Sequence, residues 1–246
     1  DLPQIAHVGD AWYEDDADFQ NQLDSLRLHW RGSDALSGIA SYEYLITSSD
    51  TDTLVHWTNV GLDTSVVVQT ALSEDLIYTS TVIAIDSAGN TSQKFASDGI
   101  LIDLTPPVAG ILYDGENNDQ DWTGTNESLT FTWSDFEDPI SGIWKYEYAI
   151  GTTSGATDTL DWTSVFIDST DVTPQVLQRI LTRQLTHAAD GGGLKTSPGS
   201  GQNSHGVNSE TEANDSTLVH PGLNLTDNTT YFVSIRAVDR AHNISD

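Results

Sequence analysis

The chain has 246 residues, of which 37% are hydrophobic and 19% are charged, and this length suffices for one large domain or two of ordinary size. Its 37 acidic and 9 basic residues give a formal net charge of −28, which excludes nucleic acid and anionic membrane surfaces as expected partners. The sequence has no cysteine, which excludes disulfides and thiolate zinc sites, and no apolar run reaches the ~18 residues of a membrane span.

In chain order, one sequence pattern occurs twice. Phe19 and Trp30 are separated by the same number of positions as Trp122 and Trp133. Three further blocks pair in the same order: SGIASYEYLI with SGIWKYEYAI, TDTLVHWT with TDTLDWT, and YTSTVIAIDSAGNTS with YFVSIRAVDRAHNIS. An internal repeat of this kind indicates two copies of one module.

Each block is predicted to be a strand, because apolar and polar residues alternate in it. The alternating positions include Leu26, Leu28 and Trp30, then Tyr42, Tyr44 and Ile46, and then Val82, Ala84 and Asp86. Short strands separated by clusters of Gly, Asn, Asp and Ser favour an antiparallel β-sandwich. The predicted fold class is therefore all-β, with two tandem sandwiches.

These blocks also carry a resemblance to a known family. The strands that end in Trp30 and Trp133, the strands YEYLI and YEYAI, and the segments AIDSAGNTS and AVDRAHNIS resemble fibronectin type III and immunoglobulin-like tandem repeats of extracellular surface proteins. A Leu six residues before a Tyr, as at Leu72 and Tyr78, is similar to a tyrosine corner. The resemblance implies a sandwich fold and carries little information about activity.

The expected domains are residues 1–104 and 105–246, joined at Pro106 and Pro107, which favour an extended and semi-rigid junction. The second domain is expected to carry an insertion over about 173–220. A helix with Thr173 as N-cap and Pro174 at its first position opens this insertion, and an irregular loop follows. The chain ends where a last strand of the second sandwich is expected, so we interpret it as a segment of a longer array.

Aspartates recur at equivalent places in the two copies, and two interpretations of them are open. The recurring residues are Asp10, Asp16 and Asp18 in the first copy and Asp114, Asp119 and Asp121 in the second. Clustered carboxylates provide the oxygen ligands that Ca²⁺ prefers, although no EF-hand pattern is present. Short aspartate side chains also form turns and caps. Asp86 and Asp239 are interpreted as caps of the turns that follow them.

Two further kinds of surface site are expected. Trp144 replaces Ala40 of the first copy and is a candidate ligand contact. The glycosylation pattern Asn-x-Ser/Thr occurs at six positions: Asn90, Asn126, Asn214, Asn224, Asn228 and Asn243. Glycans at such sites would lie on surface loops.

The sequence contains no recognised catalytic or phosphate-binding motif, so the chain is not expected to be an enzyme. We expect a secreted or cell-surface segment that acts as a spacer, an adhesive module or a filament-assembly module. Its expected partners are neighbouring repeats, copies of itself or surface glycans, and its only expected cofactor is Ca²⁺. The alternative is an accessory carbohydrate-binding module of a secreted hydrolase, with Trp144 and Trp122 as contacts.

Overall fold

The computed structural model describes residues 1–10, 16–50, 52–116, 119–167 and 216–246, and its regular elements in these ranges are all β-strands. The chain divides into two compact units. The first consists of Asp1–Thr105 with Arg240–Asn243, and the second of Pro106–Asp239 with Ile244–Asp246. No described segment forms a helix long and apolar enough to cross a membrane.

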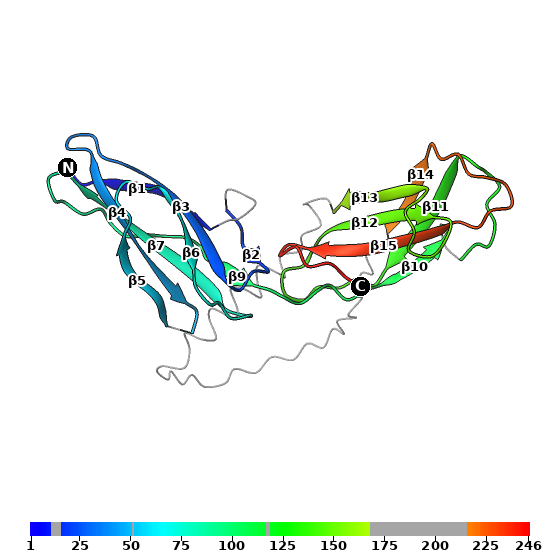
Figure 1. Cartoon of the computed structure of the whole chain (residues 1–246), viewed down its shortest axis with the longest axis horizontal. Coiled ribbons are helices and arrows are strands. Elements are labelled where there is room, and N and C mark those ends of the chain that lie inside the picture. The colour runs from blue at the N-terminus through cyan, green and yellow to red at the C-terminus, as the bar shows by residue number, and fades with distance from the viewer. Residues whose placement is uncertain (11–15, 51, 117–118, 168–215) are drawn as a thin grey trace, which may run out of the picture. The chain divides into compact units, whose positions relative to one another are not determined.

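The first unit consists of two sheets (Figure 1). One sheet has the order β1-β3-β6, and the other runs β2-β9-β7-β4-β5 with β8 beside β7. All pairs are antiparallel except β2 with β9, which the sequence did not predict. The strands are β1 (Gln4–Asp10), β2 (Phe19–Gln20), β3 (Ser25–Ser33), β4 (Ile39–Ser48), β5 (Thr53–Asn59), β6 (Ser65–Gln69), β7 (Ile77–Asp86), β8 (Phe95–Ala96) and β9 (Ile100–Ile102).

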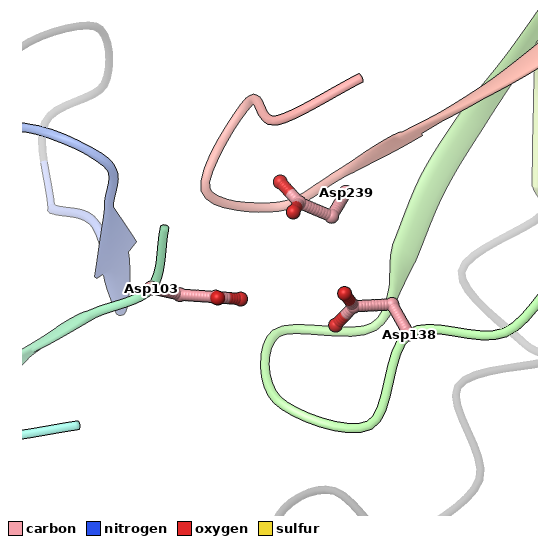
Figure 2. A group of neighbouring side chains, drawn as sticks. All are labelled: Asp103, Asp138 and Asp239. Carbon is pink, nitrogen blue, oxygen red and sulfur yellow. The ribbon is translucent and has the colours of Figure 1, made fainter. Parts of the chain in front are cut away.

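The second unit repeats this arrangement with fewer described strands. Its sheets have the orders β10-β11-β14 and β13-β12-β15, which correspond to β1-β3-β6 and β5-β4-β7 of the first unit. In the loop between β11 and β12, Asp138 lies near Asp239, the last residue of β15 (Figure 2). The strands are β10 (Ile111–Asp114), β11 (Ser128–Ser134), β12 (Ile143–Gly151), β13 (Leu160–Phe166), β14 (Ser216–Pro221) and β15 (Phe232–Asp239).

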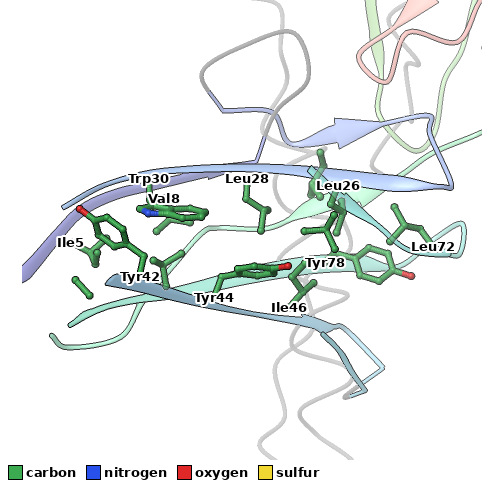
Figure 3. Close-up of a cluster of buried hydrophobic side chains, with 14 of the residues drawn as sticks. Ile5, Val8, Leu26, Leu28, Trp30, Tyr42, Tyr44, Ile46, Leu72 and Tyr78 are labelled. Carbon is green, nitrogen blue, oxygen red and sulfur yellow. The ribbon is translucent and has the colours of Figure 1, made fainter. Parts of the chain in front are cut away.

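The core of the first unit lies between its two sheets and contains aromatic side chains from both (Figure 3). Trp30 of β3 is buried against Tyr42 and Tyr44 of β4, with ring centroids 5.9 and 6.4 Å apart respectively. Leu28 of β3 and Val82 of β7 are fully buried beside them. The alternation predicted from the sequence therefore places these side chains on the inner faces.

The core of the second unit uses the equivalent positions. Trp133 of β11 packs on Tyr146 of β12 at 5.3 Å between centroids, and Phe131 packs on Tyr148 at 5.0 Å. All four side chains are buried. Trp30 and Trp133, which occupy equivalent places in the repeat, are thus both core residues.

Both units contain a tyrosine corner. The main-chain N–H of Ser73 donates to the hydroxyl oxygen of Tyr78 at 2.9 Å, and the N–H of Thr226 donates to that of Tyr231 at 2.8 Å. Leu72, six residues before Tyr78, is buried, and the corner at Tyr78 agrees with the resemblance noted in the sequence. This contact fixes the loop that enters β7 or β15.

A β-bulge occurs at the same place in each unit. The register of β4 against β7 shifts between Ile39 and Ser41, and that of β12 against β15 shifts between Ile143 and Lys145. The additional residue in β12 is Trp144. A bulge redirects a side chain away from the regular alternation, so this residue leaves the pattern of its strand.

Residues 173–215 of the predicted insertion at about 173–220 lie outside the described residues. The helix expected from Thr173 falls in this range. Residues 216–220 belong to β14, which pairs with β11 as β6 pairs with β3. The structure thus assigns the last part of the expected insertion to a sandwich strand. Thr217 and Val219, both of which favour strands, lie within this segment.

Candidate functional site

Two of the three candidate calcium residues of the first unit meet in one loop. The N–H of Asp10 donates to Oδ1 of Asp16 at 3.0 Å, and the N–H of Ala17 donates to the main-chain oxygen of Asp10 at 2.8 Å. Asp18 is exposed, and its main-chain oxygen accepts a hydrogen bond from Leu101 at 2.8 Å. The Asp16 carboxylate therefore accepts the N–H group of the last residue of β1.

The second unit repeats this loop. The N–H of Asp114 donates to Oδ1 of Asp119 at 3.4 Å, and the N–H of Gln120 donates to the main-chain oxygen of Asp114 at 2.8 Å. Asp121 is exposed. In the described part of either unit taken alone, no three acidic or histidine side chains bring ligand atoms within 4.8 Å of one another. Calcium binding by the six aspartates stays a prediction.

Asp10 has the most unusual environment of these carboxylates. Only 1% of its surface is exposed, and neither carboxylate oxygen has a hydrogen-bond partner. Burial raises the pKa of Asp10 from 3.8 to about 6. The hydroxyl groups of Ser97 and Ser80 lie near enough to lower this pKa in part, but not in hydrogen-bonding geometry. In the second unit, burial and the nearby Asp119 raise the pKa of Asp114.

Each unit contains a second aspartate loop that was not predicted from the sequence. It precedes β4 in the first unit and β12 in the second. Oδ1 of Asp34 accepts the N–H groups of Leu36, Ser37 and Gly38 at 3.1, 2.7 and 2.7 Å. The loop closes because Gly38 has φ of +73°, a conformation that favours glycine. Burial opposes a low pKa of Asp34, but these N–H donors outweigh it and lower the pKa.

Asp138 makes the same loop in the second unit. Its Oδ1 accepts the N–H groups of Ile140, Ser141 and Gly142 at 3.1, 2.8 and 2.7 Å, and Gly142 has φ of +76°. The signal in the sequence was an Asp four residues before a Gly in each copy, in SDALSGI and EDPISGI.

Asp86, at the end of β7, caps the following turn as predicted. Its Oδ1 accepts the N–H groups of Ala88 at 2.9 Å and Asn90 at 2.8 Å. Its Oδ2 accepts the side-chain amide of Asn90 at 2.8 Å, and this bond is the main cause that lowers the pKa of Asp86. The side-chain amide of Asn90, a candidate glycosylation site, therefore already donates a hydrogen bond within this turn.

The other candidate glycosylation sites differ in exposure. Asn126, Asn224 and Asn228 are exposed, Asn243 is half-buried, and Asn214 lies outside the described residues. Glycosylation at any of the six stays a prediction.

Trp144 is half-buried and packs beside an exposed aromatic residue of the second unit. Its ring meets that of Phe166 of β13 edge to face at 5.6 Å, and the ammonium group of Lys145 lies 5.0 Å from the Trp144 centroid. The Phe166 side chain is 62% exposed. Trp122, the other aromatic candidate, is 87% exposed.

Charged side chains on β12 and β15 form a further cluster, which shares Lys145 with the aromatic group of Trp144 and Phe166. The guanidinium of Arg236 donates to Oε2 of Glu147 at 2.9 and 2.7 Å and covers the ring of Trp162 at 4.0 Å. Lys145 donates to Oε1 of the same carboxylate at 2.6 Å. Burial raises the pKa of Glu147, but the bonds from Lys145 and Arg236 outweigh burial and lower it.

No protein-family model and no curated protein matches the chain. Among solved structures, it is similar to a two-domain fibronectin type III segment of chicken tenascin, at 13% identity over 98% of this chain and 94% of that chain, with a TM-score of 0.28. It is also similar to the FN1–FN3 domains of chicken CNTN1, at 15% identity over 99% of this chain and 62% of that chain, again with a TM-score of 0.28. The fibronectin type III-like fold follows from the strand order and the tyrosine corners themselves, and a fold alone does not define an activity.

Proposed function

We propose that the chain is a non-catalytic structural segment of an extracellular protein, in which two tandem copies of one fibronectin type III-like module act as a spacer or assembly element. One observation carries this proposal: each unit repeats the same sheet order, tyrosine corner, β-bulge and aspartate-capped loops. A duplicated scaffold of this kind supports a spacer or assembly role, because the repeated features maintain the fold in each unit.

The side chains of the loops support the absence of catalysis. A catalytic site needs a nucleophile, an acid–base pair or a metal in a preorganised arrangement. In the loops at Asp34, Asp86 and Asp138, the carboxylates instead accept main-chain N–H groups and hold turns. Their chemistry therefore serves the scaffold.

The charge supports a role as an extended spacer. With a formal net charge of −28, neighbouring copies repel one another at long range, and ionic strength screens this repulsion. We propose neighbouring repeats or further copies of the chain as partners, at the cell surface or in a secreted filament.

The spacer function is tested by stretching single molecules that contain the chain between marker domains. A mechanical spacer should unfold in two force steps per chain. Each step should lengthen the molecule by roughly 3.3–3.6 Å per residue released. One step for the whole chain, or extension without a force peak, would contradict two independent load-bearing modules.

The extracellular location is tested separately. Antibodies against residues 1–105 should label intact source cells, and labelling only after permeabilisation would overturn the extracellular assignment.

A second candidate function is carbohydrate binding, and the aromatic group of Trp144 and Phe166 favours it. Exposed aromatic rings stack on the apolar faces of sugar rings, and large exposed apolar groups mark interaction sites. Polysaccharide pull-down should then be lost in Trp144→Ala and retained in Trp122→Ala, which removes an exposed ring outside this group. Binding that survives Trp144→Ala would contradict this candidate.

A further inference from the structure

One carboxylate oxygen of Asp138 accepts hydrogen bonds from the main chain of its loop, and the other accepts none. Oδ1 holds the three main-chain N–H groups described above, while Oδ2 is buried without a hydrogen-bond partner. A buried charged oxygen without a partner is strongly unfavourable. Binding of an external ligand to this oxygen would remove the unfavourable free energy.

A second carboxylate lies near that of Asp138. Asp239 is 0% exposed, and one of its carboxylate oxygens lies within 4.8 Å of one of Asp138. Figure 2 shows both side chains, one from the loop before β12 and the other from the end of β15; Asp103, also labelled, belongs to the first unit. Two carboxylates at this distance repel each other unless a cation or a proton lies between them.

The first unit repeats the arrangement at Asp34 and Asp86. Oδ2 of Asp34 is also buried without a partner, and Asp86 is 2% exposed. The Ser37 hydroxyl donates to Oδ1 of Asp34 at 3.1 Å and also interacts with Asp86, which brings the two carboxylates into one neighbourhood. Ile39 pairs with Asp86 across β4 and β7, as Ile143 pairs with Asp239 across β12 and β15.

The recurrence of an unpartnered oxygen at the same repeat position in both units is the second observation, beyond the acidic pair itself. The environment of Asp34 is built from its own unit, where Ser37 and Gly38 close the loop around Oδ1. The loop turns Oδ1 toward its N–H donors and leaves Oδ2 for another ligand. Asp86 accepts three hydrogen bonds, and a carboxylate has about four acceptor positions.

We propose that each unit binds one Ca²⁺ ion between these carboxylates, with Asp34 and Asp86 as ligands in the first unit and Asp138 and Asp239 in the second. All donor atoms are hard oxygens, which suit Ca²⁺. Two carboxylates provide only part of the six to eight oxygens that Ca²⁺ takes, and water completes the shell. The dissociation constant should therefore lie at about 10⁻⁴–10⁻³ M, the range of extracellular modules. This site is separate from the six aspartates of the Asp10 and Asp114 loops, and it does not depend on the spacer function.

The test is a Ca²⁺ titration of the full chain, followed by the amide NMR signals of Gly38 and Gly142 at constant ionic strength. Each amide bonds to Oδ1 of a proposed ligand at 2.7 Å, so each reports on its own site. Both signals should shift and saturate in the millimolar range. Asp138→Asn keeps the oxygen that accepts the N–H groups and removes the charge, so it should weaken binding at Gly142 about tenfold or more and leave Gly38 unchanged. Asp34→Asn should do the reverse.

Asp63→Asn is the matched control, because Asp63 is exposed and the charge change is the same. It should leave both titrations unchanged, and circular dichroism should show that every variant is folded. Signals that do not saturate, or that respond equally to Asp63→Asn, would show a diffuse ion atmosphere and overturn the proposal. Binding that is lost in Asp18→Asn or Asp121→Asn and kept in Asp34→Asn and Asp138→Asn would place the ion in the other loops. Signals that shift with pH and not with Ca²⁺ would show a shared proton instead.

Discussion

The carboxyl group of Asp10 is buried beside Ser80 and Ser97, and its folded-state pKa of about 6 exceeds the value of 3.8 for an unperturbed group. A raised folded pKa means that the native state favours the protonated acid. The associated stability is complete below pH 3.8 and is lost as the pH rises to 6. The total is about 3 kcal/mol, since one pKa unit corresponds to about 1.4 kcal/mol.

We therefore predict that Asp10→Asn, which cannot ionise, will unfold at higher denaturant concentration than the wild type at pH 7.5. The two proteins should differ much less near pH 4. Urea unfolding at both pH values measures the difference, with Asp63→Asn as the control for surface charge. An equal difference at both pH values would show that the Asp10 carboxylate ionises freely in the folded protein.

Removal of the tyrosine hydroxyl should lower stability at both tyrosine corners, but by a different amount in each unit. Tyr78→Phe leaves the N–H of Ser73, in a partly buried contact, without its acceptor, and this should cost about 1–3 kcal/mol. Tyr231→Phe should cost less, because the N–H of Thr226 lies in an exposed contact where water can replace the hydroxyl. Thermal unfolding of both variants tests the order, and a larger loss for Tyr231→Phe would contradict it.

At the scale of elements, the hairpin between β12 and β13 has no space for a side chain at Gly151. A Cβ atom there would overlap the main-chain oxygen of Ala156. Gly151→Ala should therefore destabilise the second unit by about 1–3 kcal/mol, as overpacking does. Gly124→Ala is the control, since a Cβ atom at that position would meet no other described side chain or main chain within 4 Å. Equal urea midpoints for the two variants would show that the hairpin relaxes at little cost.

The strands could be predicted from the sequence because burial follows their period of two. Tyr42, Tyr44 and Ile46 are buried in β4, as the alternation indicated. The bulge at Trp144 could not be predicted, because a one-residue shift in register leaves no local signal. The parallel pair of β2 and β9 was missed for a related reason: each strand is only two or three residues long and pairs across distant sequence.

The candidate site was predicted only in part. Asp10 and Asp16 recur in the sequence as Asp114 and Asp119, and in both units the two residues of each pair are joined by a hydrogen bond. The burial of Asp10 depends on Ser80 and Ser97, which are far away in sequence. The loop of Asp34 had a sequence signal, an Asp four residues before Gly38, but its buried Oδ2 depends on packing that spacing does not show.

At the scale of the whole molecule, the formal net charge of −28 predicts that salt stabilises the protein. Raising NaCl from 0.01 to 0.15 M shortens the Debye length from about 30 to about 8 Å and screens repulsion among the acidic groups. A gain of about 1 kcal/mol would raise Tm by roughly 4–8 °C in units of about 100 residues. Differential scanning calorimetry in chelator separates this effect from ion binding, and a Tm that falls with salt would show that attractive pairs dominate.

The positions of the few basic residues have a consequence for digestion by trypsin-like proteases. Arg27 and Arg31 lie in β3, and Lys145 lies in β12; each of these strands has neighbours on both sides in its sheet. Cleavage occurs most readily at exposed loop tips, where the backbone is free of sheet pairing. A strand held on both edges must first leave its sheet before it can be cut, so these three bonds are protected for as long as the sandwiches stay folded.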